Sequence, residues 1–107
     1  MKKANGDIIM SNYRFRLGEI ILTIGVVKLI KSSIKISKKI DDALFRYAAH
    51  DWGDTCEEDK VLNDAAVKNG NDRVVALYKL ENDVEIFIIT ETEKDRSYTT
   101  IMLTEEY

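Results

Sequence analysis

The chain has 107 residues, of which 45% are hydrophobic, and its formal net charge is −3. This length fits one domain that can bury a core without disulfide bonds, and a single cysteine cannot form one within the chain. The composition therefore excludes a disulfide-rich scaffold, and the longest apolar run, residues 20–27, is too short to cross a bilayer.

Residues 1–12 are predicted to form a flexible leader, and residues 13–107 are predicted to form a single α+β domain. The leader begins with Met1-Lys2-Lys3 but lacks the apolar stretch that a secretion signal needs. We therefore expect a cytoplasmic protein with no membrane segment. The domain opens with a strand over residues 14–23, after which the hydroxyl of Thr23 can cap a short helix through Val26, Val27 and Ile30.

A longer helix is expected to begin with Ser37 as its N-cap and to end near His50. Its apolar residues follow the spacing of an amphipathic helix and are Ile40, Ala43, Leu44, Tyr47 and Ala48. A further helix restarts near Thr55, whose hydroxyl can cap it, and Gly70 gives a typical C-terminal stop. We expect the apolar face of this helix to consist of Val61, Leu62, Ala65 and Ala66.

The last third of the chain changes to the composition of β-strands. Residues 73–80, 84–90 and 98–104 are rich in β-forming residues, and residues 81–83 suit a hairpin turn. The order of a strand, then helices, then strands predicts an α+β fold, in which helices pack on one face of an antiparallel sheet.

The rarest residues of the chain lie together in residues 50–56. The only histidine (His50), the only tryptophan (Trp52) and the only cysteine (Cys56) all fall there. Zinc accepts nitrogen, sulfur and oxygen donors, so the segment predicts a structural zinc site with His50, Asp54 and Cys56 as metal ligands. The fourth donor could be Asp51, an acid of the 91–95 loop, a water or a residue of a second copy.

A purely structural interpretation of residues 50–56 stands beside the zinc hypothesis. In it, His50 ends a helix where a cation interacts favourably with the macrodipole, Trp52 fills the core, and Cys56 is a small buried hydrophobe. A nucleophilic pair of Cys56 and His50 is disfavoured because the neighbouring acids Asp54 and Glu57 oppose formation of the thiolate. We therefore expect that the protein is not an enzyme. The alternative is a metal-dependent hydrolase in which His50 and Asp54 are metal ligands.

Charge is distributed unevenly along the chain. Residues 1–40 hold nine Lys or Arg against two acids, whereas residues 41–107 hold seven against seventeen. Lysines at helical spacing are typical of a solvated face, so no direct contact with nucleic acid is expected, while the acidic part suits a basic protein surface. The residues we expect to contact a partner are Glu57, Glu58, Asp59, Asp95 and Arg96.

Several strings in the chain resemble a family of small proteins carried by plasmids and phages. They are His50-x-Trp52-Gly53-Asp54-x-Cys56-Glu57-Glu58-Asp59-Lys60-x-x-Asn63, Ile88-Ile89-Thr90-Glu91, Asp95-Arg96-Ser97-x-Thr99-Thr100-Ile101 and Glu105-Glu106-Tyr107. The likeness runs from about Phe15 to the C-terminus. The chain departs from the family pattern at Thr92-Glu93-Lys94, which lengthens one segment, and at Thr104, where a proline is common.

In size, acidity and mobile-element setting the chain also looks like a type II-A anti-CRISPR protein. That resemblance implies a location in the bacterial host cytoplasm and a host defence protein as the partner. An RNA-guided nuclease exposes basic channels for nucleic acid, so a small acidic protein could dock there and hinder DNA loading without chemistry. An anti-restriction or regulatory protein that binds a different defence protein is the alternative.

Overall fold

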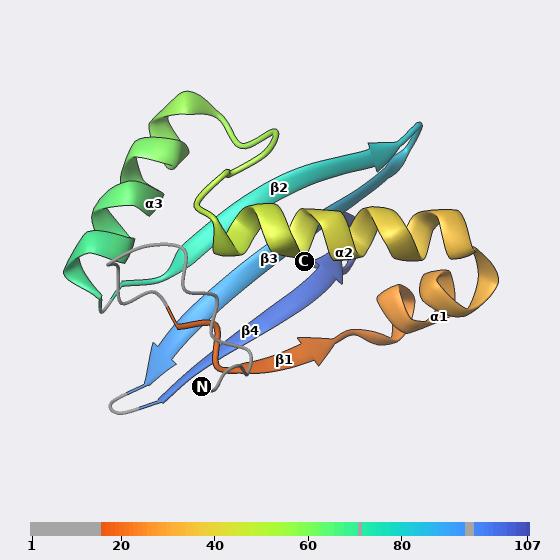
Figure 1. Ribbon diagram of the computed structural model, residues 1–107, viewed down its shortest axis with the longest axis horizontal. Helices are drawn as coiled ribbons and strands as arrows, with labels where there is room; N and C mark the ends of the chain where they lie inside the picture. The colour runs from red at the N-terminus through yellow and green to blue at the C-terminus, as the bar shows by residue number, and fades with distance from the viewer. Residues whose placement is uncertain (1–15, 71, 94–95) are drawn as a thin grey trace.

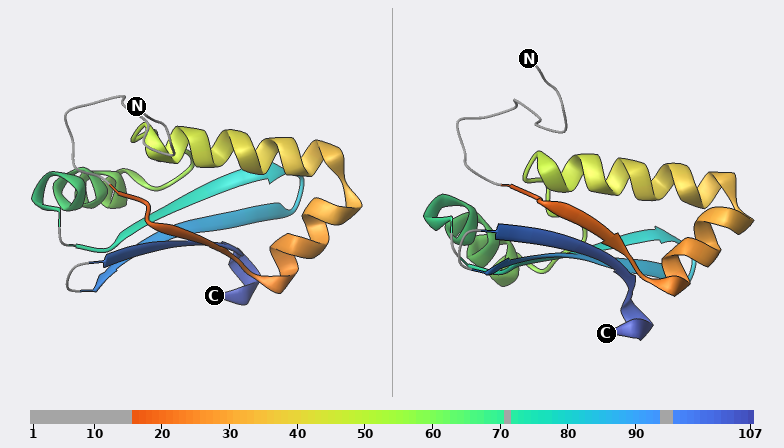
Figure 2. Two further views of the ribbon diagram at one scale, coloured as in Figure 1. Left: turned by 60° about the horizontal axis from the view of Figure 1, so that its bottom comes forward. Right: turned by 90° about the horizontal axis from the view of Figure 1, so that it is seen from below.

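The computed structural model describes residues 16–70, 72–93 and 96–107, so the leader expected at residues 1–12 lies outside the described part. The elements in chain order are β1 (Glu19–Leu22), α1 (Ile24–Ser32), α2 (Ile34–Ala48), α3 (Glu57–Asn69), β2 (Val74–Glu81), β3 (Val84–Glu93), β4 (Arg96–Leu103) and the 3-10 helix η1 (Thr104–Glu106). Figure 2 shows α2 lying over one face of the sheet, while η1 lies toward the other face. The predicted α+β fold is confirmed.

The sheet has the strand order β1-β4-β3-β2, so β1 and β2 form its two borders, as Figure 1 shows. The pairs β2–β3 and β3–β4 are antiparallel, as predicted. The sheet is mostly antiparallel, and it departs from the predicted antiparallel pairing only at β1, which pairs with β4 in parallel. A parallel pair requires a long connection, and here that connection contains three helices and two strands of the same domain.

Local capping residues set the starts of the first two helices. The hydroxyl of Thr23 accepts a hydrogen bond from the Val26 N–H, which confirms the predicted cap of α1. The helix α2 begins one turn earlier than predicted, because Ser33 and not Ser37 is its N-cap. The Ser33 backbone is extended and its hydroxyl accepts the Ile36 N–H at 3.1 Å. Ser37 therefore lies inside the helix and does not cap it.

The core lies between α2 and the sheet. Alternate residues of β2 are buried on this face, and so is one stripe of α2; the residues are Val74, Ala76, Tyr78 and Leu80 with Ile36, Ile40, Ala43 and Tyr47. The hydroxyl of Tyr47 lies 2.7 Å from that of Thr90, which lies 2.8 Å from that of Thr99. Burial raises the pKa of Tyr47 above its ordinary value, so its hydroxyl stays protonated.

The C-terminal end of the chain caps the start of α1. The carboxylate of Glu106 accepts hydrogen bonds from the Thr23 hydroxyl at 2.6 Å, the Leu103 N–H at 2.8 Å and the Gly25 N–H at 3.0 Å. These bonds, with that from Thr23 as the largest cause, lower the pKa of Glu106. The ring of Tyr107 contacts that of Phe87 on the sheet face opposite α2, with centroids 5.4 Å apart. The ending Glu105-Glu106-Tyr107 therefore has a structural role.

None of the helices in the described ranges combines the length and the apolar character needed to cross a membrane.

Candidate functional site

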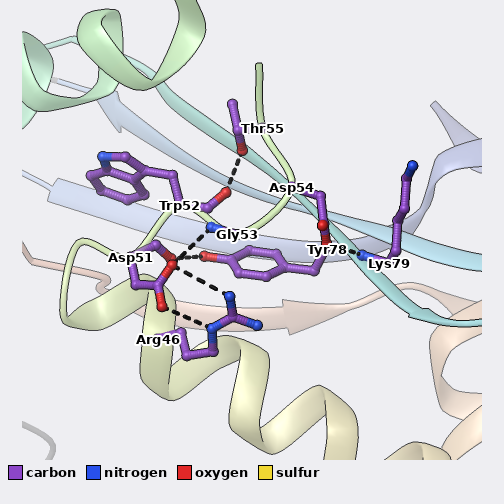
Figure 3. A network of polar contacts seen from close by, with 8 residues as sticks. All are labelled: Arg46, Asp51, Trp52, Gly53, Asp54, Thr55, Tyr78 and Lys79. Carbon is purple, nitrogen blue, oxygen red and sulfur yellow. Dashed lines mark hydrogen bonds and ion pairs between the residues drawn. The ribbon is translucent and has the colours of Figure 1, made fainter. Parts of the chain in front are cut away.

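The segment of rare residues, 50–56, lies along the outer edge of β2. The helix α2 ends at Ala48, and His50 takes a left-handed backbone conformation with φ of 67° that turns the chain back. Gly53 then forms an isolated parallel bridge with Leu77 of β2. Figure 3 shows the resulting contacts between this segment, α2 and β2. The position of the segment is therefore decided by β2, which lies more than twenty residues further along the chain.

Three hydrogen bonds join the segment to the outer edge of β2. The Asp54 N–H donates to the carbonyl of Leu77 at 2.8 Å, and the Leu77 N–H donates to the Thr55 hydroxyl oxygen at 2.9 Å. The Lys79 N–H donates to the Asp54 carboxylate at 2.8 Å. The Thr55 hydroxyl itself donates to the carbonyl of Trp52 (Figure 3). Thr55 therefore links Trp52 in the segment to Leu77 in β2. Thr55 was expected to cap α3, and that expectation is wrong, because its hydroxyl is engaged here and Cys56 is the N-cap.

Asn63 of α3 completes the cover of this edge. Its side-chain amide donates to the Val75 carbonyl at 2.8 Å, and its side-chain carbonyl accepts the Val75 N–H at 3.2 Å. A buried asparagine thus replaces the two hydrogen bonds that a neighbouring strand would make with Val75. We call the outer side of Val75, Leu77 and Lys79, with its partners Asp54, Thr55 and Asn63, the capped edge.

Trp52 fixes the capped edge to the core. Its ring is buried and meets the ring of Tyr47 edge to face, with centroids 5.5 Å apart. The indole N–H donates to the Asp64 carboxylate of α3 at 2.8 Å, and the imidazole of His50 stacks on the indole at 5.6 Å. The interpretation of Trp52 as a core residue is confirmed. Burial is the main cause that lowers the pKa of His50, so the neutral imidazole is favoured there.

Gly53 is required for the close contact between the segment and β2. Its φ of +62° is one that side chains rarely adopt, and a Cβ there would lie 2.4 Å from the Tyr78 ring and 2.9 Å from the Leu77 carbonyl oxygen. The Tyr78 hydroxyl donates to the carbonyl of Asp51 at 2.8 Å (Figure 3). Any larger residue at position 53 would therefore push the segment away from the strand.

Asp51 orders the turn that leads into this contact. Its carboxylate accepts hydrogen bonds from the guanidinium of Arg46 at 2.9 Å and from the Gly53 N–H at 3.1 Å. The bond from Arg46 is the largest of the causes that lower the pKa of Asp51. This carboxylate therefore stays ionised and acts as a local tie between α2 and the segment.

The three residues expected to bind zinc have separate environments. His50 stacks on Trp52, the carboxylate of Asp54 accepts the Lys79 N–H, and Cys56 is exposed at the start of α3. The interpretation of Cys56 as a buried hydrophobe is therefore wrong. Within residues 16–70, 72–93 and 96–107, no group of three or more His, Cys, Asp or Glu residues is arranged to hold a metal ion. Bound zinc, with these three residues as its ligands, stays a prediction.

The residues expected to contact a partner divide into two groups. Glu57, Glu58 and Asp59 form the exposed first turn of α3. Asp95 lies outside the described residues, and Arg96 begins β4 but its side chain is not described. Only the group on α3 can therefore be placed on a surface.

The helix α3 turns a different face to the core than its apolar pattern predicts. Val61 and Leu62 are 66% and 64% exposed, whereas the buried residues are Asn63, Ala66 and Val67. The two hydrogen bonds of Asn63 with Val75 fix this rotation of the helix. The predicted apolar face is therefore wrong at Val61, Leu62 and Ala65 and right at Ala66, because a polar anchor decides which side meets β2. A signal was present in the spacing of Asn63, Ala66 and Val67, which share one side of a helix.

The likeness to plasmid- and phage-borne proteins rests on the sequence strings alone. Those strings contain Trp52, Gly53, Asp54 and Asn63, which build or support the capped edge, and Glu106, which caps α1. No family model, no curated protein and no solved structure matches the chain.

Proposed function

We propose that the chain is a binding protein without enzymatic activity that inhibits a host defence system through protein contact. Its target would be a type II RNA-guided nuclease, as in an anti-CRISPR protein, and the contact would hinder the loading of DNA. Two things support this proposal: the resemblance to mobile-element proteins, and the surface that α3 presents.

That surface, which we call the α3 surface, combines acids with exposed apolar side chains. Its residues are Glu57, Glu58, Asp59, Val61 and Leu62. The acids complement a basic channel for nucleic acid, and they also oppose phosphate, so contact with the nuclease is favoured over contact with DNA. The two apolar side chains add area that becomes buried on contact, which acids alone would not provide.

The α3 surface is also held in place before any partner binds. On the same helix, Asn63 is bonded to Val75, and Asp64 accepts the indole N–H of Trp52. A surface that is already ordered loses less conformational entropy on binding than a flexible one. Residues 50–63 therefore support the proposed function by holding α3 in place. The single observation that carries the proposal is the pair of exposed apolar side chains, Val61 and Leu62, among acids on this fixed helix.

The test is inhibition by the whole chain in cells that carry an active type II system. We expect the chain to raise phage plaquing in those cells and not in matched cells without the system. Glu57→Lys with Glu58→Lys should abolish this effect, because the charge that faces a basic channel is reversed. Asp41→Lys with Asp42→Lys on α2 is the matched control, since both acids are exposed and the net charge changes equally. Unchanged plaquing with the wild-type chain would contradict the proposal.

A purified system separates the target from the mechanism. The nuclease with its guide RNA is mixed with the chain, and binding of target DNA is measured by gel shift. Reduced DNA binding that the α3 variant fails to cause supports hindered loading. Capture of a different defence protein by the wild-type chain, with no effect on the nuclease, would instead favour the anti-restriction alternative.

Zinc is tested separately by metal analysis of the purified chain and of Cys56→Ser. One equivalent of zinc that is lost in the variant would support the predicted ligand. A wild-type chain that contains no zinc, and that gains none on incubation with the metal, would contradict it.

A further inference from the structure

The outer edge of β1 differs from the capped edge. Among the described residues, β1 pairs with β4 on one side and with no strand on the other. The Thr23 N–H donates to the Ile101 carbonyl at 3.2 Å, and backbone groups alternate in direction along a strand. Glu19 and Ile21 therefore direct their backbone groups toward β4, whereas Ile20 and Leu22 direct theirs outward.

The side chains of this edge are apolar and open to solvent. Ile20, Ile21 and Leu22 are 40%, 39% and 39% exposed. Natural edge strands are usually protected by an inward charge, a proline, a bulge or a covering segment. These three residues contain no charge and no proline, and their register with β4 runs without a shift. Apart from its length of four residues and the charge of Glu19 at one end, β1 lacks the usual protection of an edge strand and can pair with another chain.

We propose that β1 pairs in antiparallel fashion with β1 of a second copy of the chain. A two-fold axis at Ile21 places Ile20 opposite Leu22 of the second copy, and the reverse. The outward N–H and carbonyl groups of these residues then bond each other across the axis. The two sheets would become one continuous sheet, with the exposed apolar side chains of both strands packed against each other.

The capped edge explains why a second copy is the occupant and why assembly stops there. A pairing partner must itself offer a free edge, and in each copy Asp54, Thr55 and Asn63 already occupy the outer groups of β2. Within the described part of the chain, β1 is then the one free edge. One free edge for each copy gives a closed pair, whereas two would permit open-ended association.

The proposed pair has a consequence for the α3 surface. Because β2 and α3 lie at the border of the sheet opposite β1, as Figure 1 shows, the pair would carry one α3 surface at each end. A partner with two equivalent sites could then bind both, which raises the apparent affinity without any new contact.

The proposed register also brings like charges near each other. Glu19 of one copy lies opposite Thr23 of the other, and the carboxylate of Glu106 already bonds Thr23. These two carboxylates repel, so removal of the charge at position 19 should favour pairing. The expected effects of Glu19→Gln and of a charge placed at Ile21 are therefore opposite in sign.

The experiment is sedimentation velocity of the full chain from micromolar to millimolar concentration. We expect the wild-type chain to pass from monomer to dimer, Ile21→Lys to stay monomeric, and Glu19→Gln to dimerise at lower concentration. Ile34→Lys is the matched control, because Ile34 is exposed at the start of α2 and the change is identical. A monomeric wild-type chain, or equal loss of dimer in the control, would overturn the proposal.

Amide hydrogen exchange tests the same pair without a variant that could misfold. The amides of Ile20 and Leu22 should exchange fast in dilute solution and slowly in concentrated solution. The amides of Leu77 and Lys79 should stay protected at every concentration, because Thr55 and Asp54 accept their hydrogen bonds within one chain. Exchange at Ile20 and Leu22 that does not change with concentration would also overturn the proposal.

Discussion

The two borders of the sheet carry the same kind of unpaired backbone groups but differ in what covers them. At β2, Asp54, Thr55 and Asn63 supply donors and acceptors to every second residue from Val75 to Lys79. At β1, the described residues supply no such cover, and three consecutive apolar side chains are about 40% exposed. The comparison indicates that the most unusual segment of the chain protects an edge.

This difference also explains the residue types at 50–63. A segment that covers a strand edge beside the core needs short polar side chains that reach backbone groups, and it needs a glycine where the chains approach closely. It also needs a large ring to attach it to the core, which Trp52 provides. Such a set resembles a ligand cluster in sequence, although its polar atoms are directed at the backbone of β2.

The largest expected effect on the capped edge comes from Gly53→Ala. The new Cβ would meet the Tyr78 ring and take an unfavourable φ, so we expect a loss of about 3 kcal/mol in the free energy of unfolding. Gly70→Ala is the matched control: Gly70 also has positive φ, but its Cβ would meet nothing within 4 Å. It should lose about 1 kcal/mol in urea unfolding. Equal losses in the two variants would show that the contact with β2 is unimportant.

A smaller effect is expected from Asn63→Ala. This change leaves the N–H and the carbonyl of Val75 without partners next to the core, at a cost of about 2 kcal/mol. Because it also frees a second edge, the variant should associate beyond the dimer when concentrated, which light scattering would detect. Asn69→Ala, at the exposed end of α3, should change stability by about 0.5 kcal/mol or less. A stable variant with no change in association would contradict the role given to Asn63.

The smallest effect concerns acid stability. Hydrogen bonds lower the folded-state pKa of Asp51 below its ordinary value of 3.8, so the unfolded chain binds this proton more readily. The contribution of Asp51 is therefore complete above that value and is lost as pH falls through the folded pKa. Asp51→Asn should be slightly less stable than the wild type near neutral pH, and the difference should close in acid. Thermal unfolding over a range of pH would measure it.

Glu106 gives the corresponding measurement near the β1 border. Its pKa is also lowered, chiefly by the hydrogen bond from Thr23, so its contribution disappears in the same direction, below an ordinary value of 4.5. Glu106→Gln should weaken the start of α1 and leave protection of Leu77 and Lys79 unchanged in hydrogen exchange. Asp51→Asn should instead weaken the protection of Leu77 and Lys79 and leave the start of α1 unchanged. Equal changes at both borders in either variant would show that the two edges are not independent.

Local sequence signals predicted the features that depend on neighbouring residues. Thr23 caps α1, Gly70 ends α3 with φ of 80°, and three C-terminal strands form as expected. The loop expected over residues 91–97 is wrong in its extent, because β3 runs to Glu93 and β4 begins at Arg96. The predicted start of α2 was one turn too late, because Ser33 and Ser37 offer the same local signal for an N-cap. The caps could be read from the chain because their hydrogen bonds join residues only three or four positions apart, and the strands because β-forming residues cluster along the sequence.

Contacts between distant residues decided the rest. Asn63 bonds Val75 across 12 positions and Asp54 bonds Lys79 across 25, and these bonds rotate α3, expose Val61 and Leu62, and direct the Asp54 carboxylate to β2. The parallel pairing of β1 with β4 likewise joins the two ends of the domain. Sequence patterns show which polar groups need partners, but the choice among the many available partners is made only when the core closes and excludes water from them.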